Sequence, residues 1–529
     1  PADQRVDALR GLQGSDCGRR GGQRPLPRHG ERLADARQDR CGRRAYQEHG
    51  RCRVDGIRGI GQVIFWSARA GDTCGHRLGA LSLFFLLAVV LPGTGGAEIH
   101  RISAGEKITP ILQQARAGDT IWLEPGEYLE NLVIDVPVTL TGEGRPHLRG
   151  GYQGVPIHIK APGTVIDGLR ISEAGTRLME DMACILVEAD GATIRNSVID
   201  EPLHGIYVKA GNGTRIEGNR IEGRLDLIEE DRGNGIHLWN SRDNFIHDNE
   251  ILNVRDGIYF SFADATVVTK NHIHRVRYGL HYMYSNDNVF EDNLFENSVA
   301  GAALMYSSDI KFLRNIFARC RGFRSYGILY QSMDDTEARS NLVLDNSRGI
   351  FLNNSARNLL LGNDVVDNDL AIQLNGDQGG NVVAGNNFIN NLSELLLDIG
   401  RPEIDWEDTE GGNFWTGYRG YDLDGDGIGD QPHTIQNVFQ VLENDYPEVR
   451  FYLFSLAARI LEMAEQALPI LELGKAQDLS PRFRPVVNDQ VPWVMVQQSY
   501  HRGNKGAALV YLLATAIPLL LLFRIGRRK

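Results

Sequence analysis

The chain repeats itself every 22 residues through its middle, and this periodicity constrains its fold more than any other feature. The repeated segments, such as GIHLWNS and GIYFSFA, start in all but one case with glycine. They begin at Gly205, Gly235, Gly257, Gly279, Gly301, Gly327, Gly349 and Ala371. The spacing is 22 residues except for a gap of 30 after Gly205 and a gap of 26 after Gly301.

A second series, made of asparagines, keeps step with the first. Each member opens a segment such as NEILN or NHIHR. The members are Asn249, Asn271, Asn293, Asn315, Asn341 and Asn363. Their one irregular gap, 26 residues, matches the irregular gap of the first series. The extra residues are therefore expected to be loops inserted into a coil, and the stacked asparagines are expected to satisfy backbone groups with their amides.

Each repeat contains short alternations of apolar and polar residues, separated by Asn, Asp, Gly and Ser. The alternation predicts strands, and the separating residues predict turns. A unit with about three short strands cannot bury a core alone, whereas stacked coils share one. The sequence therefore predicts an all-β fold, a right-handed parallel β-helix, with roughly thirteen coils between residues 106 and 400. A leucine-rich repeat would show its leucine pattern, and a propeller would need a longer period.

One face of the predicted helix is rich in potential metal ligands and aromatic rings. The first and third residues after each glycine are mostly apolar and should point inward, so the second and fourth should point outward. The outward residues singled out as contacts for copper or for a partner are His237, Trp239, Tyr259, His281, Met283 and Met305. Imidazole and thioether groups suit copper, above all Cu(I), bound transiently. The alternatives are a groove for a protein or polysaccharide partner, or packing beneath loops; His272 and His274 form a weaker pair on another strand.

A loop near the end of the repeats is rich in aspartate. Residues 422–430 read DLDGDGIGD, which places Asp422, Asp424, Asp426 and Asp430 between glycines. Clustered carboxylates on a loop suit a hard cation, so calcium is expected here. The alternative is a turn that the aspartate side chains hold by themselves.

The first 97 residues are expected to be separate from the folded protein. Residues 1–76 contain fifteen Arg, no Lys and nine acidic residues, and they show no sustained period, which predicts a disordered or non-native leader. Residues 77–97 hold one Arg, the apolar run LGALSLFFLLAVVL and small residues, as in a secretory signal peptide. The β-helix with its closing loop is then assigned to residues 98–447 and to the periplasm.

The C-terminal part changes to helical patterns. Residues 448–505 are predicted to be a helical and irregular docking segment. Residues 506–523 are eighteen residues without a charge, which predicts a transmembrane helix, and residues 524–529 form a basic cytoplasmic tail. These features predict a protein anchored on the outer side of the inner membrane.

Charge and composition narrow the function. The net charge of −12 disfavours binding of nucleic acid through phosphate contacts. Enzymes with this fold that act on acidic polysaccharides need clustered carboxylates or basic groups on one strand face. The outward positions offer no such group, so no catalytic residue is assigned and the chain is predicted not to be an enzyme. A polysaccharide lyase or epimerase is the alternative.

Three parts of the sequence, in this order, resemble the NosD family. They are GDTIWLEPGEYLENLVIDVPVTLTGEG, coils such as NNSARNLLLGNDVVDNDLAIQL, and the closing GGNFWTGYRGYDLDGDGIGDQPH. The likeness covers about residues 100–450. It implies a periplasmic β-helix protein that is needed to mature nitrous oxide reductase.

The same resemblance implies partners. NosD proteins work with an ABC transporter, made of the NosF ATPase and the NosY permease, and with the copper lipoprotein NosL. Together they help assemble the copper centres of the reductase. The predicted C-terminal span departs from the family pattern, because a NosD protein is expected to attach through its permease.

Overall fold

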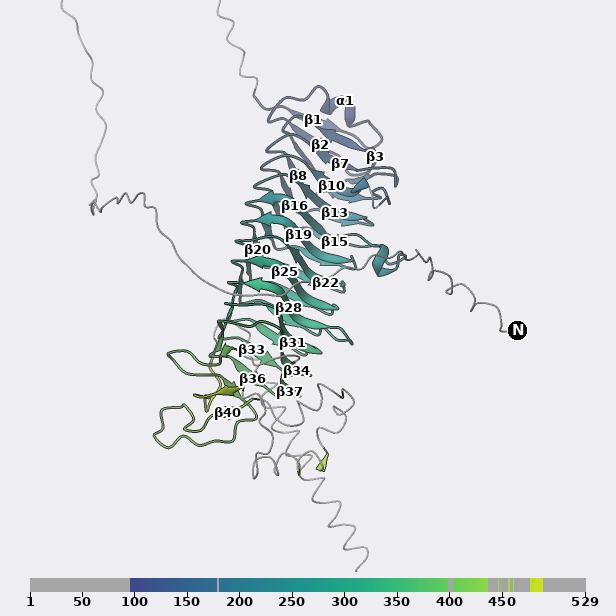
Figure 1. The fold of residues 1–529 in the computed structure, drawn as a ribbon. Helices are drawn as coiled ribbons and strands as arrows, with labels where there is room; N and C mark the ends of the chain where they lie inside the picture. The colour runs from purple at the N-terminus through teal and green to yellow at the C-terminus, as the bar shows by residue number, and fades with distance from the viewer. Residues whose placement is uncertain are drawn as a thin grey trace, which may run out of the picture. The chain divides into compact units, whose positions relative to one another are not determined.

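The protein is a right-handed parallel β-solenoid of about fourteen turns. The computed structural model describes residues 96–177, 180–397, 403–435, 446, 455–456, 460 and 476–488. Figure 1 shows the strands stacked coil upon coil, from α1 and β1 at one end to β36 and β37 at the other. The predicted β-helix and its coil length are therefore confirmed, and the first strand begins at Ile99.

Three parallel sheets run along the solenoid in its described part, and each complete coil contributes one strand to each sheet, whereas the coils at the two ends contribute to fewer. Sheet one contains β1 (Ile99–Ile102), β2 (Thr120–Leu123), β5 (Thr139–Gly142), β8 (Val165–Asp167), β11 (Thr193–Arg195), β14 (Arg215–Glu217), β17 (Phe245–His247), β20 (Val267–Thr269), β23 (Val289–Glu291), β26 (Lys311–Leu313), β29 (Glu337–Arg339), β32 (Leu359–Leu361), β35 (Asn381–Ala384) and β38 (Ile404–Asp405).

Sheet two contains β4 (Leu132–Ile134), β7 (Ile157–Ile159), β10 (Ala183–Val187), β13 (His204–Lys209), β16 (Ile236–Arg242), β19 (Asp256–Asp264), β22 (Tyr278–Met283), β25 (Ala300–Ser308), β28 (Tyr326–Asp334), β31 (Arg348–Asn353), β34 (Leu370–Asn375) and β37 (Ser393–Leu397). Its strands β13 to β34 correspond to the repeated segments that begin at Gly205 to Ala371 in the sequence.

Sheet three contains β3 (Glu127–Leu129), β6 (His147–Arg149), β9 (Arg170–Ser172), β12 (Val198–Asp200), β15 (Arg220–Glu222), β18 (Glu250–Leu252), β21 (His272–His274), β24 (Leu294–Glu296), β27 (Ile316–Ala318), β30 (Leu342–Leu344), β33 (Asp364–Val366), β36 (Asn387–Ile389) and β39 (Phe414–Trp415). A short helix α1 (Thr109–Leu112), a 3-10 turn η2 (Glu229–Asp231) and the strand pair β40 (His433–Thr434) and β41 (Gln477–Asp478) complete the described elements.

The core is a set of columns formed by equivalent inward residues of successive coils. The predicted inward positions are buried, as Ile236 and Leu238 illustrate. Phe290 and Phe312 stack with ring centroids 4.8 Å apart, because parallel strands in register bring equivalent side chains together. The apolar positions of the alternating sequence are therefore the ones that stack along the solenoid and form its core.

The asparagine series forms a buried ladder along one corner. Oδ1 of Asn293 accepts hydrogen bonds from the backbone N–H and the side-chain amide of Asn271, both at 2.9 Å. Nδ2 of Asn293 donates to the carbonyl of Val268 and to Oδ1 of Asn315, again at 2.9 Å. The expectation that these amides satisfy backbone groups is confirmed. The ladder supplies hydrogen bonds to backbone N–H and C=O groups that would otherwise be buried without a partner at the turns.

A glycine lies at the start of strands β13 to β31 of sheet two, as the second residue or just before the strand, because coils approach closely there. A Cβ atom on Gly257 would lie 2.6 Å from the carbonyl oxygen of Gly279 and 2.4 Å from Cγ2 of Ile273. The extra residues of the 30- and 26-residue repeats lie between β15 and β16 and between β27 and β28. Both are loops inserted into a coil, as predicted, and both precede a strand of sheet two.

The end of the solenoid is covered by residues 476–488. Oδ2 of the buried Asp478 accepts hydrogen bonds from the backbone N–H of Asn413 at 2.7 Å and from Nε1 of Trp415 at 2.8 Å. These residues belong to the segment 448–505 that was predicted to be helical and irregular, and in this part it is extended chain with β41.

Several predicted segments lie outside the described residues. They are the leader 1–76, almost all of the signal peptide 77–97, most of the docking segment 448–505, the predicted span 506–523 and the tail 524–529. Within the described part of the chain, no helix is long and apolar enough to cross a membrane.

Candidate functional site

The predicted ligand face lies on the outside of sheet two, where strands β13 to β25 pair in register. Tyr207, His237, Tyr259 and His281 form a column of rings, one on each coil. Successive ring centroids are 4.3, 4.6 and 4.8 Å apart. The column is partly covered, because Tyr207 is buried and the other three rings are half-buried. This face is therefore a packed surface and not the fully open one that strand alternation predicts.

His237 lies in the most enclosed part of the column. Burial, followed by the influence of His204 and of Arg255, lowers the pKa of His237 to about 3. Burial and Arg255 also lower the pKa of His204 to about 4, and the two rings are 5.3 Å apart. Both imidazoles are thus neutral at physiological pH.

His281 is held by a buried carboxylate. Oδ2 of Asp256 accepts a hydrogen bond from Nδ1 of His281 at 2.9 Å, while Nε and Nη2 of Arg277 donate to Asp256 at 2.9 and 2.6 Å. Burial opposes ionisation of Asp256, but the hydrogen bonds from His281 and Arg277 outweigh it and lower the pKa of this carboxyl. Because Nδ1 faces the carboxylate of Asp256, Nε2 is the nitrogen of His281 that is left for a ligand.

Asp256 is not among the residues that the sequence analysis singles out. Asp256 is the first residue of β19 and is completely buried. It lies one coil before His281, displaced along the strand, so spacing in the sequence does not reveal the contact.

Two thioethers lie beside this imidazole. Met283 follows His281 on β22 and pairs with Met305 of β25 on the next coil. The hydroxyl of Tyr259 donates to Sδ of Met283 at 3.9 Å. The structure thus brings four of the predicted residues together, Tyr259, His281, Met283 and Met305.

The other two predicted residues are more distant. His237 and Trp239 lie on β16, two coils from β22, which is about 10 Å. Trp239 is 38% exposed, so it is available to a partner. An imidazole with a free nitrogen and two thioethers on adjacent coils form a soft donor set, which is the set that Cu(I) prefers. The residues present therefore fit copper.

The aspartate loop holds itself by hydrogen bonds. Asp422 accepts from the N–H groups of Gly425 and Gly427, at 2.7 and 3.1 Å, and Asp430 accepts from that of Leu423 at 2.6 Å. Carboxylate oxygens of Asp422, Asp424 and Asp426 lie within 4.8 Å of one another. Both interpretations of this loop, a calcium site and a self-supporting turn, are compatible with that arrangement, and calcium stays a prediction.

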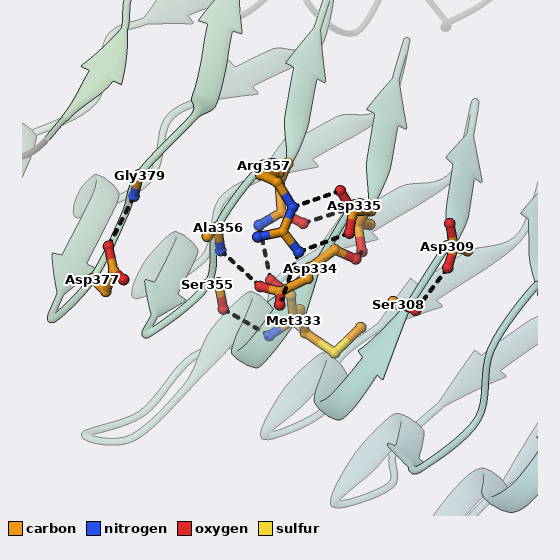
Figure 2. Close-up of polar contacts among 12 residues, drawn as sticks. Ser308, Asp309, Met333, Asp334, Asp335, Ser355, Ala356, Arg357, Asp377 and Gly379 are labelled. Carbon is orange, nitrogen blue, oxygen red and sulfur yellow. Dashed lines mark hydrogen bonds and ion pairs between the residues drawn. The ribbon is translucent and has the colours of Figure 1, made fainter. Parts of the chain in front are cut away.

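Carboxylates also gather at the turns between sheet two and sheet one. Asp287, Asp309 and Asp335 line a shallow cavity of about 500 Å³ together with Lys311 and Arg357. Figure 2 shows Arg357 reaching both neighbouring aspartates of one turn. Its guanidinium donates to Asp335 at 2.9 and 2.8 Å and lies 3.1 Å from Asp334. The hydrogen bond from Arg357 lowers the pKa of Asp335, which is the behaviour of a structural ion pair.

Comparison with known proteins identifies the family. Residues 217–420 match the family described as "Periplasmic copper-binding protein (NosD)". A relative from Pseudomonas aeruginosa, named "Probable ABC transporter binding protein NosD", is 35% identical over 432 residues, which are 78% of this chain and 97% of the relative. The chain belongs to the NosD family. A NosD relative of the same name from Stutzerimonas stutzeri is 31% identical over 434 residues, 79% of this chain and 96% of that protein.

The similarity to solved structures is low. The A-module of a mannuronan C-5 epimerase from Azotobacter vinelandii is 15% identical, with a TM-score of 0.34, over 57% of this chain and 90% of that chain. A family 28 exopolygalacturonase from Yersinia enterocolitica is 10% identical, with a TM-score of 0.40, over 59% of this chain and 78% of that chain. The NosD match itself contains strands β15 to β39, with the predicted His and Met residues from His237 to Met305, but it ends before Asp422.

Proposed function

We propose that this NosD protein is a periplasmic accessory protein that helps assemble the copper centres of nitrous oxide reductase, together with an ABC transporter. Support comes from the family, which is described as periplasmic and copper-binding, and from relatives named as ABC transporter binding proteins. The proposed partners are a permease and an ATPase of the NosY and NosF type, a copper lipoprotein of the NosL type, and the reductase.

Copper is the cargo in this proposal, and the face on sheet two receives it. Nε2 of His281 and the sulfur atoms of Met283 and Met305 would hold Cu(I), while Asp256 keeps the imidazole in the correct tautomer. The observation that carries the proposal is this carboxylate-held histidine beside two methionines in a NosD chain. Neutral and weakly basic ligands bind Cu(I) reversibly, which suits a protein that passes the ion on.

The remaining residues of the face are proposed to contact a partner. Trp239 is exposed beside the column, and aromatic residues are typical anchors of protein interfaces. Attachment to the membrane through residues 506–523 is part of the same proposal, since a periplasmic surface that meets a transporter must be kept near it.

Complementation of a bacterium that lacks its own NosD tests the proposal. The full chain should restore copper to nitrous oxide reductase, measured as copper per reductase and by the visible absorption of its copper centres. A chain with His281→Ala, Met283→Leu and Met305→Leu should fail, whereas Met333→Leu, a change of the same kind in the core, should succeed. Full reductase copper with the triple variant would contradict the proposal.

A further inference from the structure

A second cluster of potential ligands lies on the outside of sheet three. Glu250 of β18 is paired in register with His272 of β21, and His274 lies two residues further on the same face. Glu250, His272 and His274 each offer one ligand atom, and these atoms lie within 4.8 Å of one another. Adjacent strands of one sheet therefore bring the carboxylate of Glu250 next to the imidazoles of His272 and His274, which follow it by 22 and 24 residues in the sequence.

His274 has an unused nitrogen that faces this cluster. The residue is only 8% exposed, and its Nε2 makes no hydrogen bond. Oε1 of Glu250 lies 3.5 Å from that nitrogen. A buried imidazole nitrogen without a hydrogen bond is costly, so its position beside a carboxylate points to a ligand between the two groups.

The surrounding groups orient the other two ligands. Nε2 of His272 bonds to Oε1 of Glu296 at 2.9 Å, which leaves Nδ1 as the free nitrogen of the ring. Arg220 forms an ion pair with Oε2 of Glu250, so the other oxygen, Oε1, is the one that faces His274. A histidine whose second nitrogen is held by a carboxylate is the usual arrangement around a bound metal ion. Nε of the exposed Arg275 donates a hydrogen bond to Nδ1 of His274 at 3.2 Å, which places the ring hydrogen of a neutral His274 on Nε2. Binding of an ion by Nε2 therefore requires Arg275 to turn away and that hydrogen to move to Nδ1.

The donor set decides which ion this cluster suits. It contains imidazole nitrogen and carboxylate oxygen but no sulfur, which favours divalent transition metals such as Zn²⁺ over Cu(I). We propose that Glu250, His272 and His274 form a second metal site, for a divalent transition-metal ion, separate from the sulfur-containing face of sheet two. The site is independent of the proposed copper function, because it uses other residues on another sheet.

Titration of the full chain with Zn²⁺ against a chromophoric chelator, with excess Ca²⁺ to occupy the aspartate loop, tests the second site. The parent should bind one equivalent of Zn²⁺ at this site. Glu250→Gln should weaken that binding at least tenfold, and His272→Gln with His274→Gln should abolish it. Two single variants serve as controls and should still bind Zn²⁺ at this site. One is His247→Gln, which changes a half-buried histidine of sheet one, and the other is His281→Ala, which changes the copper face.

Several results would overturn the inference. One is a parent chain that does not bind this equivalent of Zn²⁺, and another is a double variant, His272→Gln with His274→Gln, that still binds it. If the double variant fails to fold, judged by circular dichroism, the conservative Glu250→Gln decides, and unchanged zinc affinity in it refutes the site. Cu(I) binding measured on the same preparations separates this outcome from failure of the proposed function, because the copper face contains none of these three residues.

Discussion

Replacement of Asp256 by Asn tests the link between the fold and the candidate copper site. The carboxylate is completely buried and accepts three hydrogen bonds, two from Arg277 and one from Nδ1 of His281, between 2.6 and 2.9 Å. Asn keeps the shape but has one oxygen and no charge. Its amide nitrogen must therefore face at least one donor of Arg277 or His281.

The structure gives the expected size of the effect. Removing one partner of a buried ion pair costs about 3–5 kcal/mol. The side chain of Arg277 is 32% exposed, so water partly rehydrates its freed charge and the lower end applies, about 3 kcal/mol. Since Asp256 also fixes the ring of His281, Cu(I) affinity should fall by about 10–100-fold, as for other residues that orient a metal ligand.

Two assays on the same protein measure these effects. Urea unfolding followed by circular dichroism gives the change in the free energy of unfolding, and competition with a chromophoric Cu(I) chelator gives the affinity. Asp292→Asn is the control, because this exposed aspartate forms a surface ion pair with Arg314 and should change stability by less than about 1 kcal/mol. Equal stability of the Asp256 and Asp292 variants, or unchanged Cu(I) affinity in the former, would refute the reasoning.

Three further predictions concern the solenoid. Burial raises the pKa of Asp364 to about 7 from 3.8, so its bound proton stabilises the fold fully below about pH 4, and this stabilisation is lost by about pH 7. Urea unfolding at several pH values should show a loss of at most about 4 kcal/mol across this range. Asp364→Asn should abolish that pH dependence. Asn293→Ala leaves the N–H of Asn271 and the carbonyl of Val268 unpaired and should cost about 2–6 kcal/mol in urea unfolding. Calcium at about a hundred times its Kd should add about 2.7 kcal/mol to stability in thermal unfolding, and Asp424→Asn should remove this gain.

Each of these has a result that would count against it. A pH-independent difference between the parent and Asp364→Asn would mean that the carboxyl is not buried as described. Asn297→Gly changes an exposed asparagine with φ of 51° and should be nearly neutral, so an equal loss in Asn293→Ala and Asn297→Gly would contradict the ladder. No thermal shift with calcium would leave the loop as a turn held by its own side chains.

The repeat predicts most of the fold because it encodes contacts between equivalent positions. Residues 22 apart, such as Met283 and Met305 or Asn271 and Asn293, become neighbours in a parallel sheet, so spacing alone predicts those contacts. The alternation of inward and outward residues also follows from strand geometry. The series of glycine-led segments begins only at Gly205, so the 22-residue spacing does not predict the pairing of the coils before it, although the solenoid already begins there with β1 to β12.

The site was predicted only in part because its decisive contacts are not between equivalent positions. Asp256 reaches His281 across 25 residues, along the strand as well as across coils. His274 and Glu250 are likewise offset by two positions on paired strands. Such diagonal contacts depend on side-chain direction and burial, which a spacing of 22 residues does not contain. A search for carboxylates one coil before each outward histidine would have found both Asp256 and Glu250.

X-ray absorption at the copper edge of the Cu(I)-loaded full chain reports the ligands of the ion itself. The proposed site requires sulfur and nitrogen neighbours from Met283, Met305 and His281, and loss of the sulfur signal in the variant with Met283→Leu and Met305→Leu. A coordination shell of nitrogen and oxygen alone in the parent, or a parent chain that binds no Cu(I), would contradict it.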